Sequence, residues 1–246
     1  MKKLIQIPLW VLLILGLFAC SEAKSLQKIV TNYPQPLGYA FFSTQNTKPR
    51  TDSVVIHFTG LDLNRSTNVK RTKTFSLPLL LVNYFESNYR FNIGQNLLQN
   101  DYNEFFFNAL LDESERSGYY ALCYDSSRIK DVYVLEVKLQ SMEAASNYIK
   151  QELYLYYFID SYSLNIQELK PSKSQLTCQI RLSKGDQILF DKPMTTSLSF
   201  PVNLTGNEDI NQMMQLLSGT MVESINQITR SCIESVVADV NRHLKP

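Results

Sequence analysis

The apolar positions of this 246-residue chain recur with a period of two in some segments and of three or four in others. Stretches rich in β-branched and aromatic residues predict extended strands. Because Pro78 cannot donate a hydrogen bond to a neighbouring strand, its stretch is expected at a sheet edge or at a bulge. The predicted strands cover residues 54–63, 72–86, 119–127, 131–142 and 152–169.

A β-hairpin is predicted at residues 174–193, with its turn at Lys184-Gly185-Asp186. Its first strand alternates between apolar and polar side chains, so one face of the sheet is expected to meet water, as antiparallel sheets allow. The apolar set is Leu176, Cys178, Ile180 and Leu182, and the polar set is Gln175, Thr177, Gln179 and Arg181.

The longer period predicts two helices. Asp101 and Glu104 suit the start of the first helix, and Gly118 suits its end. Its exposed face is expected to carry Asp112, Glu113 and Glu115. The second helix is expected to begin near Asn207 or Asp209. Its apolar stripe consists of Met213, Leu217, Met221, Ile225, Ile228, Cys232, Val236, Val240 and Leu244.

An amphipathic helix of this length needs an apolar surface, which the sheet supplies. The predicted fold is therefore a single α+β domain over residues 53–246. Its sheet is expected to be mixed but largely antiparallel, with five or six strands and two helices packed on one face. Residues 20–52 are polar and interrupted by prolines, which predicts an extended tether.

The first residues carry the pattern of an export signal. A short positive segment precedes an uncharged run over residues 4–21, whose strongly apolar part is residues 9–18. That length fits a cleaved signal peptide over residues 1–19 better than a membrane-spanning helix. Cleavage after Ala23 is the alternative, and it would free a soluble chain that starts at Lys24.

The segment Leu17-Phe18-Ala19-Cys20 resembles the lipobox of bacterial lipoproteins, with an aliphatic residue three positions before the cysteine and a small residue just before it. In that family the cysteine sulfur carries a diacylglyceryl group, and the new amino terminus is acylated. The resemblance therefore implies lipid attachment at Cys20, whose several acyl chains would hold the protein at a membrane. Because Ser21 is not aspartate, the family's sorting rule favours the outer membrane.

The order of the predicted elements resembles that of ABC-transport auxiliary lipoproteins, which are small partners of lipid-trafficking transporters, and of envelope-assembly lipoproteins. The features that carry this resemblance are the lipobox, a strand-helix-strand start, long antiparallel hairpins and a closing helix. The resemblance implies a non-enzymatic accessory role in the cell envelope.

Charge and cysteine spacing argue against several kinds of site. The formal net charge is +1, which gives no electrostatic case for nucleic acid as a partner. Cys123, Cys178 and Cys232 are spaced unlike a zinc motif and allow at most one disulfide within the chain. All three are expected to be buried, and His57 is expected to lie within the sheet. No cofactor or metal site is predicted.

Alternating aromatic residues in the strand at 152–169 form the candidate binding surface. Leu153 and Leu155 are expected to face the helices. The opposite face then carries the candidate partner-binding or lipid-binding residues Tyr154, Tyr156 and Phe158. The alternative is that the N-terminal segment folds back and covers these rings through Tyr39, Phe41 and Phe42.

These features predict a lipid-anchored, non-enzymatic binding or scaffold protein of the envelope. Its expected partners are the membrane, through the anchor, and either an envelope protein or an acyl chain. Two alternatives stay open. An envelope hydrolase would use Cys123 or a serine, with His57 within hydrogen-bond reach of the nucleophile. A structural surface lipoprotein would instead assemble with itself.

Overall fold

The computed structural model describes residues 22–41, 45–47, 50, 52–78, 82–124, 132–157, 160–202 and 208–244. The predicted signal peptide and Cys20 lie outside this part of the chain. Within it the fold is α+β with a mostly antiparallel open sheet, as predicted. The prediction of five or six strands and two helices is wrong, because the described chain forms eight strands and three helices.

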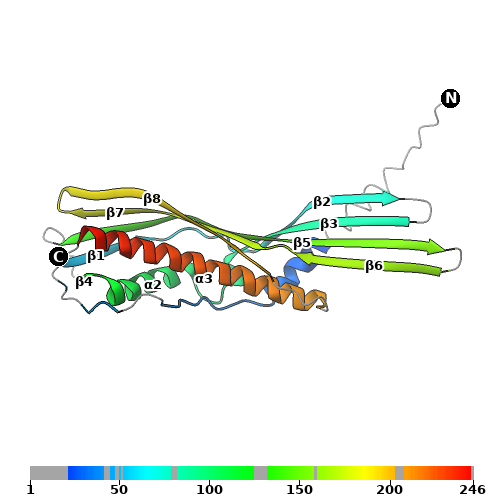
Figure 1. Ribbon diagram of the computed structural model, residues 1–246, viewed down its shortest axis with the longest axis horizontal. Coiled ribbons are helices and arrows are strands. Elements are labelled where there is room, and N and C mark those ends of the chain that lie inside the picture. Colours follow the sequence, from blue (N-terminus) through cyan, green and yellow to red (C-terminus); the bar gives the residue numbers. More distant parts are fainter. Residues whose placement is uncertain are drawn as a thin grey trace, which may run out of the picture.

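One half of the sheet belongs to the body of the molecule. It contains β1 (Asp52–Thr59), β4 (Tyr120–Leu122), the first half of β5 (Tyr133–Tyr157), β7 (Ser172–Lys184) and β8 (Gln187–Phe200). These strands lie in the order β4-β1-β5-β7-β8, with β1 parallel to both of its neighbours. Helices α2 (Tyr102–Ser117) and α3 (Ile210–His243) cover one face of this half, as Figure 1 shows.

The other half of the sheet projects beyond the helices, and we call it the arm. It consists of β2 (Asn68–Pro78), β3 (Val82–Asn92), the second half of β5 and β6 (Asp160–Leu169). All four strands are antiparallel to their neighbours and lie in the order β2-β3-β5-β6. In Figure 1 the arm extends past the start of α3, and no helix of the described residues lies against its distal part.

Strand β5 runs through both halves over 25 residues, and it contains one irregularity that matters for the arm. Its register against β7 shifts between Leu139 and Ser141, which leaves Gln140 as an extra residue. Before the shift, Leu135 and Leu139 are buried against the helices, whereas after it Tyr148 is buried there. The buried face of β5 therefore changes from odd to even positions.

The predicted start of the first helix is confirmed, because the Asp101 side chain accepts hydrogen bonds from the backbone N–H groups of Asn103 and Glu104. Asp209 and Gln212 form the reciprocal capping box at the start of α3. Every residue of the predicted apolar stripe in α3 is buried. In the described part of the chain, no helix is long and apolar enough to span a membrane.

A third helix occupies residues 22–31, where the sequence pattern predicts a tether. Leu26 and Val30 on this helix are buried in the main core. The Gln27 side-chain amide also donates a hydrogen bond of 2.7 Å to the Thr67 carbonyl. The prediction of an extended tether is therefore wrong for this segment, because two apolar residues one turn apart suffice to dock it.

Two predicted strands are in fact hairpins. Residues 72–86 fall in the antiparallel pair β2 and β3, and residues 152–169 fall in the pair β5 and β6. Pro78 is the last residue of β2, which is an edge strand, so the edge position predicted for this proline is confirmed. The hairpin of β7 and β8 turns at Gly185, whose φ of 55° suits a residue without Cβ.

Candidate functional site

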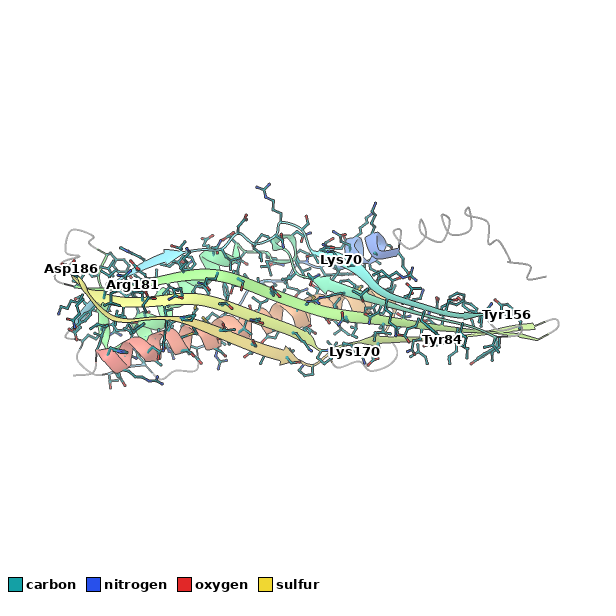
Figure 2. The ribbon with its side chains drawn as sticks, turned by 90° about the horizontal axis from the view of Figure 1, so that it is seen from above. Lys70, Tyr84, Tyr156, Lys170, Arg181 and Asp186 are labelled. Atoms are coloured by element: carbon teal, nitrogen blue, oxygen red, sulfur yellow. The ribbon has the colours of Figure 1, made fainter. Side chains whose placement is uncertain are left out.

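The two predicted site residues that the structure describes, Tyr154 and Tyr156, lie near the distal end of the arm. Figure 2 shows Tyr84 and Tyr156 near the end of the tapering sheet, far from Asp186 at the opposite end of the molecule. Tyr154 is half-buried and Tyr156 is 43% exposed. Phe158 lies outside the described residues, as does Cys20.

The face on which these tyrosines lie differs from the prediction. Tyr148 points to the side that carries the helices in the body, and alternate residues of a strand share one face. Tyr154 and Tyr156 therefore lie on the helix side of the sheet, whereas Leu153 and Leu155 lie on the opposite side. The expected assignment is reversed because the extra residue at Gln140 inverts the alternation.

The face away from the helices, which we call the outer arm face, is strongly apolar. Register pairs across the four strands place Leu77, Tyr84, Leu153 and Leu164 in one row, and Phe75, Glu86, Gln151 and Ile166 in the next. The exposed members are Phe75 at 45%, Leu77 at 45%, Tyr162 at 58%, Leu164 at 40% and Ile166 at 50%. Val82, Tyr84, Leu153 and Leu155 are half-buried between them.

The helix side of the arm, which we call the inner arm face, is polar apart from its aromatic rings. Phe85 and Tyr154 contact each other edge to face, with ring centroids 6.0 Å apart. The Tyr154 hydroxyl donates a hydrogen bond of 3.4 Å to Glu152. The remaining side chains of this face include Thr74, Ser76, Lys150, Ser163, Asn165 and Gln167.

The polarity of the sheet therefore reverses along its length. In the body the helix side is apolar, as Ile180 and Leu182 show, and the other side is polar, as Gln175 and Arg181 show. In the arm the outer face, which continues that polar side, becomes apolar. A sheet face of this kind that no helix covers has the character of a binding surface.

Charged side chains form a band below the distal end of the arm. The Lys73 ammonium lies 3.3 Å from the Glu86 carboxylate, which also accepts a hydrogen bond of 3.0 Å from the Tyr84 hydroxyl. These bonds from Tyr84 and Lys73 hold the pKa of Glu86 below its ordinary value. Beyond the band, residues 75–85 and 153–157 contain no charged residue, whereas Asp160 at the start of β6 is charged.

The helix over residues 22–31 is fixed to the base of the arm on its inner face. The Lys150 ammonium lies 3.2 Å from the Glu22 carboxylate, which also accepts a hydrogen bond from the Tyr89 hydroxyl. The Tyr89 ring stacks on Tyr148, with centroids 6.0 Å apart. Burial and the bond to Glu22 raise the pKa of Tyr89. Glu22 is two residues after Cys20, so the predicted lipid site is close in sequence to the base of the arm.

The N-terminal segment does not cover the aromatic strand through the residues that are described. The Tyr39 hydroxyl donates a hydrogen bond of 3.3 Å to Glu113 on α2. The Phe41 ring lies 5.0 Å from the Arg116 guanidinium at the end of the same helix. Phe42 is outside the described residues. Glu113 is buried, so its predicted place on an exposed face is wrong, because Tyr39 and Ser117 solvate its carboxylate.

The residues of the hydrolase alternative meet at one shallow pocket. His57 and Cys123 both line a space of about 240 Å³, together with Phe107 and Leu111 of α2. His57 lies within the sheet on β1, as predicted, and its side chain is exposed. Cys123 is half-buried, so its predicted burial is wrong. Among the described residues, no group of three or more His, Cys, Asp or Glu side chains could hold a metal ion.

Cys178 of β7 and Cys232 of α3 are buried, as predicted. Their sulfur atoms lie 3.5 Å apart between the sheet and the helix. The pairing with Cys178 and burial raise the pKa of the Cys232 thiol. These two thiols belong to the core of the body and not to the arm.

Sequence reasoning missed the exposed residues Phe75, Leu77, Leu164 and Ile166 as members of the outer arm face. Their signal is an alternation of apolar and polar residues in two separate segments, such as Leu164-Asn165-Ile166. Comparisons of the chain with models of known families, with curated proteins and with solved structures found no match.

Proposed function

We propose that this protein is a lipid-anchored, non-enzymatic binding or scaffold protein of the bacterial cell envelope, with the arm as its binding element. The outer arm face is the part that contacts acyl chains of a membrane or of a lipid cargo. The single observation that carries this proposal is an apolar sheet face, exposed at Phe75, Leu77, Leu164 and Ile166, against which no helix lies in the described part of the chain.

The distribution of charge supports the same contact. The charged band at Lys73 and Glu86 lies below residues 75–85 and 153–157, which carry no charge, and this distribution suits a segment that meets a membrane surface. Tyrosines such as Tyr84 and Tyr156 suit the boundary between headgroups and acyl chains, since each combines an apolar ring with a polar hydroxyl.

The proposed anchor at Cys20 fits this arrangement. Glu22 is bonded to Lys150 and Tyr89, so a lipid attached two residues earlier would hold the base of the arm close to the bilayer. The narrower proposal is an accessory lipoprotein of a lipid-trafficking or envelope-assembly system. It is supported by the resemblance in element order and by a surface suited to acyl chains.

Two isoleucines allow a matched test of the arm. Ile166 on the outer arm face and Ile188 on β8 are each 50% exposed. The full chain with Cys20→Ser is mixed with vesicles of phosphatidylethanolamine and phosphatidylglycerol and then sedimented. This substitution removes the lipid anchor, and all variants share the apolar residues 9–18, so that differences in binding report on the protein surface.

Ile166→Asn is expected to weaken vesicle binding by about fivefold, because it removes about 1 kcal/mol of apolar burial. Ile188→Asn is expected to leave binding unchanged. Equal binding of both variants and the parent chain would overturn the proposed role of the arm. Mass spectrometry of the natural chain separately tests the anchor, since an unmodified Cys20 would contradict it.

A further inference from the structure

Both long edges of the arm are unpaired within the described chain. β2 pairs only with β3, and β6 pairs only with β5. The side chains at residues 72–77 and 162–166 on these two edges are exposed. Natural proteins usually protect an edge strand of this length, because its free N–H and C=O groups can pair with another chain.

The directions of the two edges allow them to pair with each other between two copies. β2 and β3 are antiparallel, as are β3 and β5, and β5 and β6, so β2 and β6 also run in opposite directions. When two arms lie side by side and point the same way, β2 of one copy meets β6 of the next as an antiparallel pair.

The rows of the arm show which side chains would then meet. Register pairs connect Lys73 through Asn88 and Ile149 to Glu168, so these two charged residues occupy opposite ends of one row. The next rows on the same face end in Phe75 and Ile166, and in Leu77 and Leu164. Continuing the rows across two copies therefore places a cation beside an anion, and apolar side chains beside apolar ones.

In the same register, the side chains of the inner arm face are also compatible between the two copies. Its rows end in Thr74 and Gln167, in Ser76 and Asn165, and in Pro78 and Ser163, so polar side chains meet polar ones there, apart from the proline. A shift by one residue would place Phe75 beside Gln167 or Asn165 and exchange the two faces. A shift by two would place Lys73 beside Ile166, or Phe75 beside Glu168.

We infer that the partner of the arm edges is a second copy of this chain, with β2 of one copy paired to β6 of the next. The interface is heterologous, so its repetition either closes into a ring or extends into a filament. This pairing does not depend on the proposed contact with lipid. It would, however, satisfy the edge hydrogen bonds wherever the arm meets an apolar medium.

A charge swap tests the inferred register. Within one chain, Lys73 contacts Glu86 and Glu168 contacts Lys170. Lys73→Glu and Glu168→Lys are each expected to weaken self-association of the full Cys20→Ser chain by about fivefold, since like charges then face each other across the strands. In the double variant, Glu at position 73 of one copy again faces Lys at position 168 of the next copy, so the attraction between copies is restored. The contacts of these two positions with Glu86 and Lys170 within one chain remain repulsive. Association is measured by sedimentation equilibrium.

Cysteine crosslinking tests the same contact directly. Leu77→Cys with Leu164→Cys, in a chain that also carries Cys20→Ser and Cys123→Ser, is expected to give a ladder of disulfide-linked multimers on mild oxidation. The two positions cannot bridge within one chain, because β3 and β5 lie between them and neighbouring strands are about 4.8 Å apart. Leu77→Cys with Ile188→Cys is the control and is expected to form no disulfide-linked multimers.

Restored association in the charge swap together with the crosslinked ladder would support the inference. A chain that stays monomeric at all concentrations, with an intact fold by circular dichroism, would overturn it. Crosslinking by Leu77→Cys alone would also overturn it, since that result indicates a symmetric pairing of β2 with β2. Vesicle binding by a monomeric chain would leave the proposed function standing while the inferred assembly fails.

Discussion

The Lys150 ammonium lies 3.2 Å from the Glu22 carboxylate and 3.0 Å from the Glu152 carboxylate, so one cation on β5 joins the N-terminal helix to the arm. Burial lowers the pKa of Lys150, but the two carboxylates outweigh this effect and raise it overall. Lys150 therefore stays charged at neutral pH and can hold the start of the helix at this place.

Removal of this cation should loosen the helix without unfolding the protein. Lys150→Met is expected to speed hydrogen exchange of the amides in residues 22–31, at a cost of about 0.5 kcal/mol or less, because partly exposed ion pairs contribute little. Lys70→Met, at an exposed position near the start of β2, is the control. Equal exchange in the two variants would contradict the role given to Lys150.

A comparison of two leucines distinguishes residues that stabilise the fold from residues that are available for binding. Leu176 is fully buried in the body, whereas Leu164 is 40% exposed on the outer arm face. Leu176→Ala is expected to lower the free energy of unfolding by about 2–5 kcal/mol, as for other large-to-small changes in a core. Leu164→Ala should cost less than about 1 kcal/mol. Urea unfolding curves measure both, and an equal loss would mean that the arm face belongs to the core.

The stability of the folded chain should depend on pH through the ionisation of Glu86. The pKa of the Glu86 carboxyl is lower in the folded chain than its ordinary value of 4.5 in the unfolded chain. Such a group stabilises the native state at every pH above the unfolded pKa, and this stabilisation is lost as the pH falls through the folded pKa. The difference in Tm between the natural chain and Glu86→Gln should therefore be constant from neutral pH to about pH 5 and should shrink below it. Thermal unfolding followed by circular dichroism measures this difference, and a constant difference down to pH 2 would contradict the prediction.

The three cysteines of the body should differ in their reaction with an alkylating reagent. Cys123 is half-buried at a pocket, whereas Cys178 and Cys232 are buried between β7 and α3. We expect native Cys178 and Cys232 to react at least about a hundredfold more slowly than Cys123, because they require local opening. Peptide mass mapping after timed quenching gives the three rates, and comparable rates would show that the core is open.

Much of the body could be predicted from the sequence, because its patterns are regular and local. The stripe from Met213 to Leu244 has the spacing of one helix face, and the cap at Asp101 is a short-range signal. The alternation from Leu176 to Leu182 likewise predicts one buried face of β7. Each of these features needs only its own segment to be recognised.

The topology of the arm could not be predicted in the same way, because its turns lack the usual signals. The residues between β2 and β3 are Leu79, Leu80 and Leu81, and those between β5 and β6 are Phe158 and Ile159. Without glycine, asparagine or aspartate there, each hairpin looks like one continuous strand.

The prediction of the sheet face that carries Tyr154 and Tyr156 was wrong for a single structural reason. The extra residue at Gln140 inverts the alternation of β5, so Tyr154 and Tyr156 lie on the face opposite to the one expected. No local composition marks this position, since Gln140 and Ser141 are ordinary strand-surface residues. The pairing partner β7 determines the shift, and that partner is more than thirty residues away in sequence.

Strand β5 has no linker along its 25 residues, which span about 80 Å in an extended conformation. A partner that binds the distal end of the arm therefore also fixes the orientation of the helical body and its distance from that partner, because no linker separates the arm from the body. A protein built this way behaves as a spacer of set length, and a load applied at one end is transmitted along a single covalent backbone to the other.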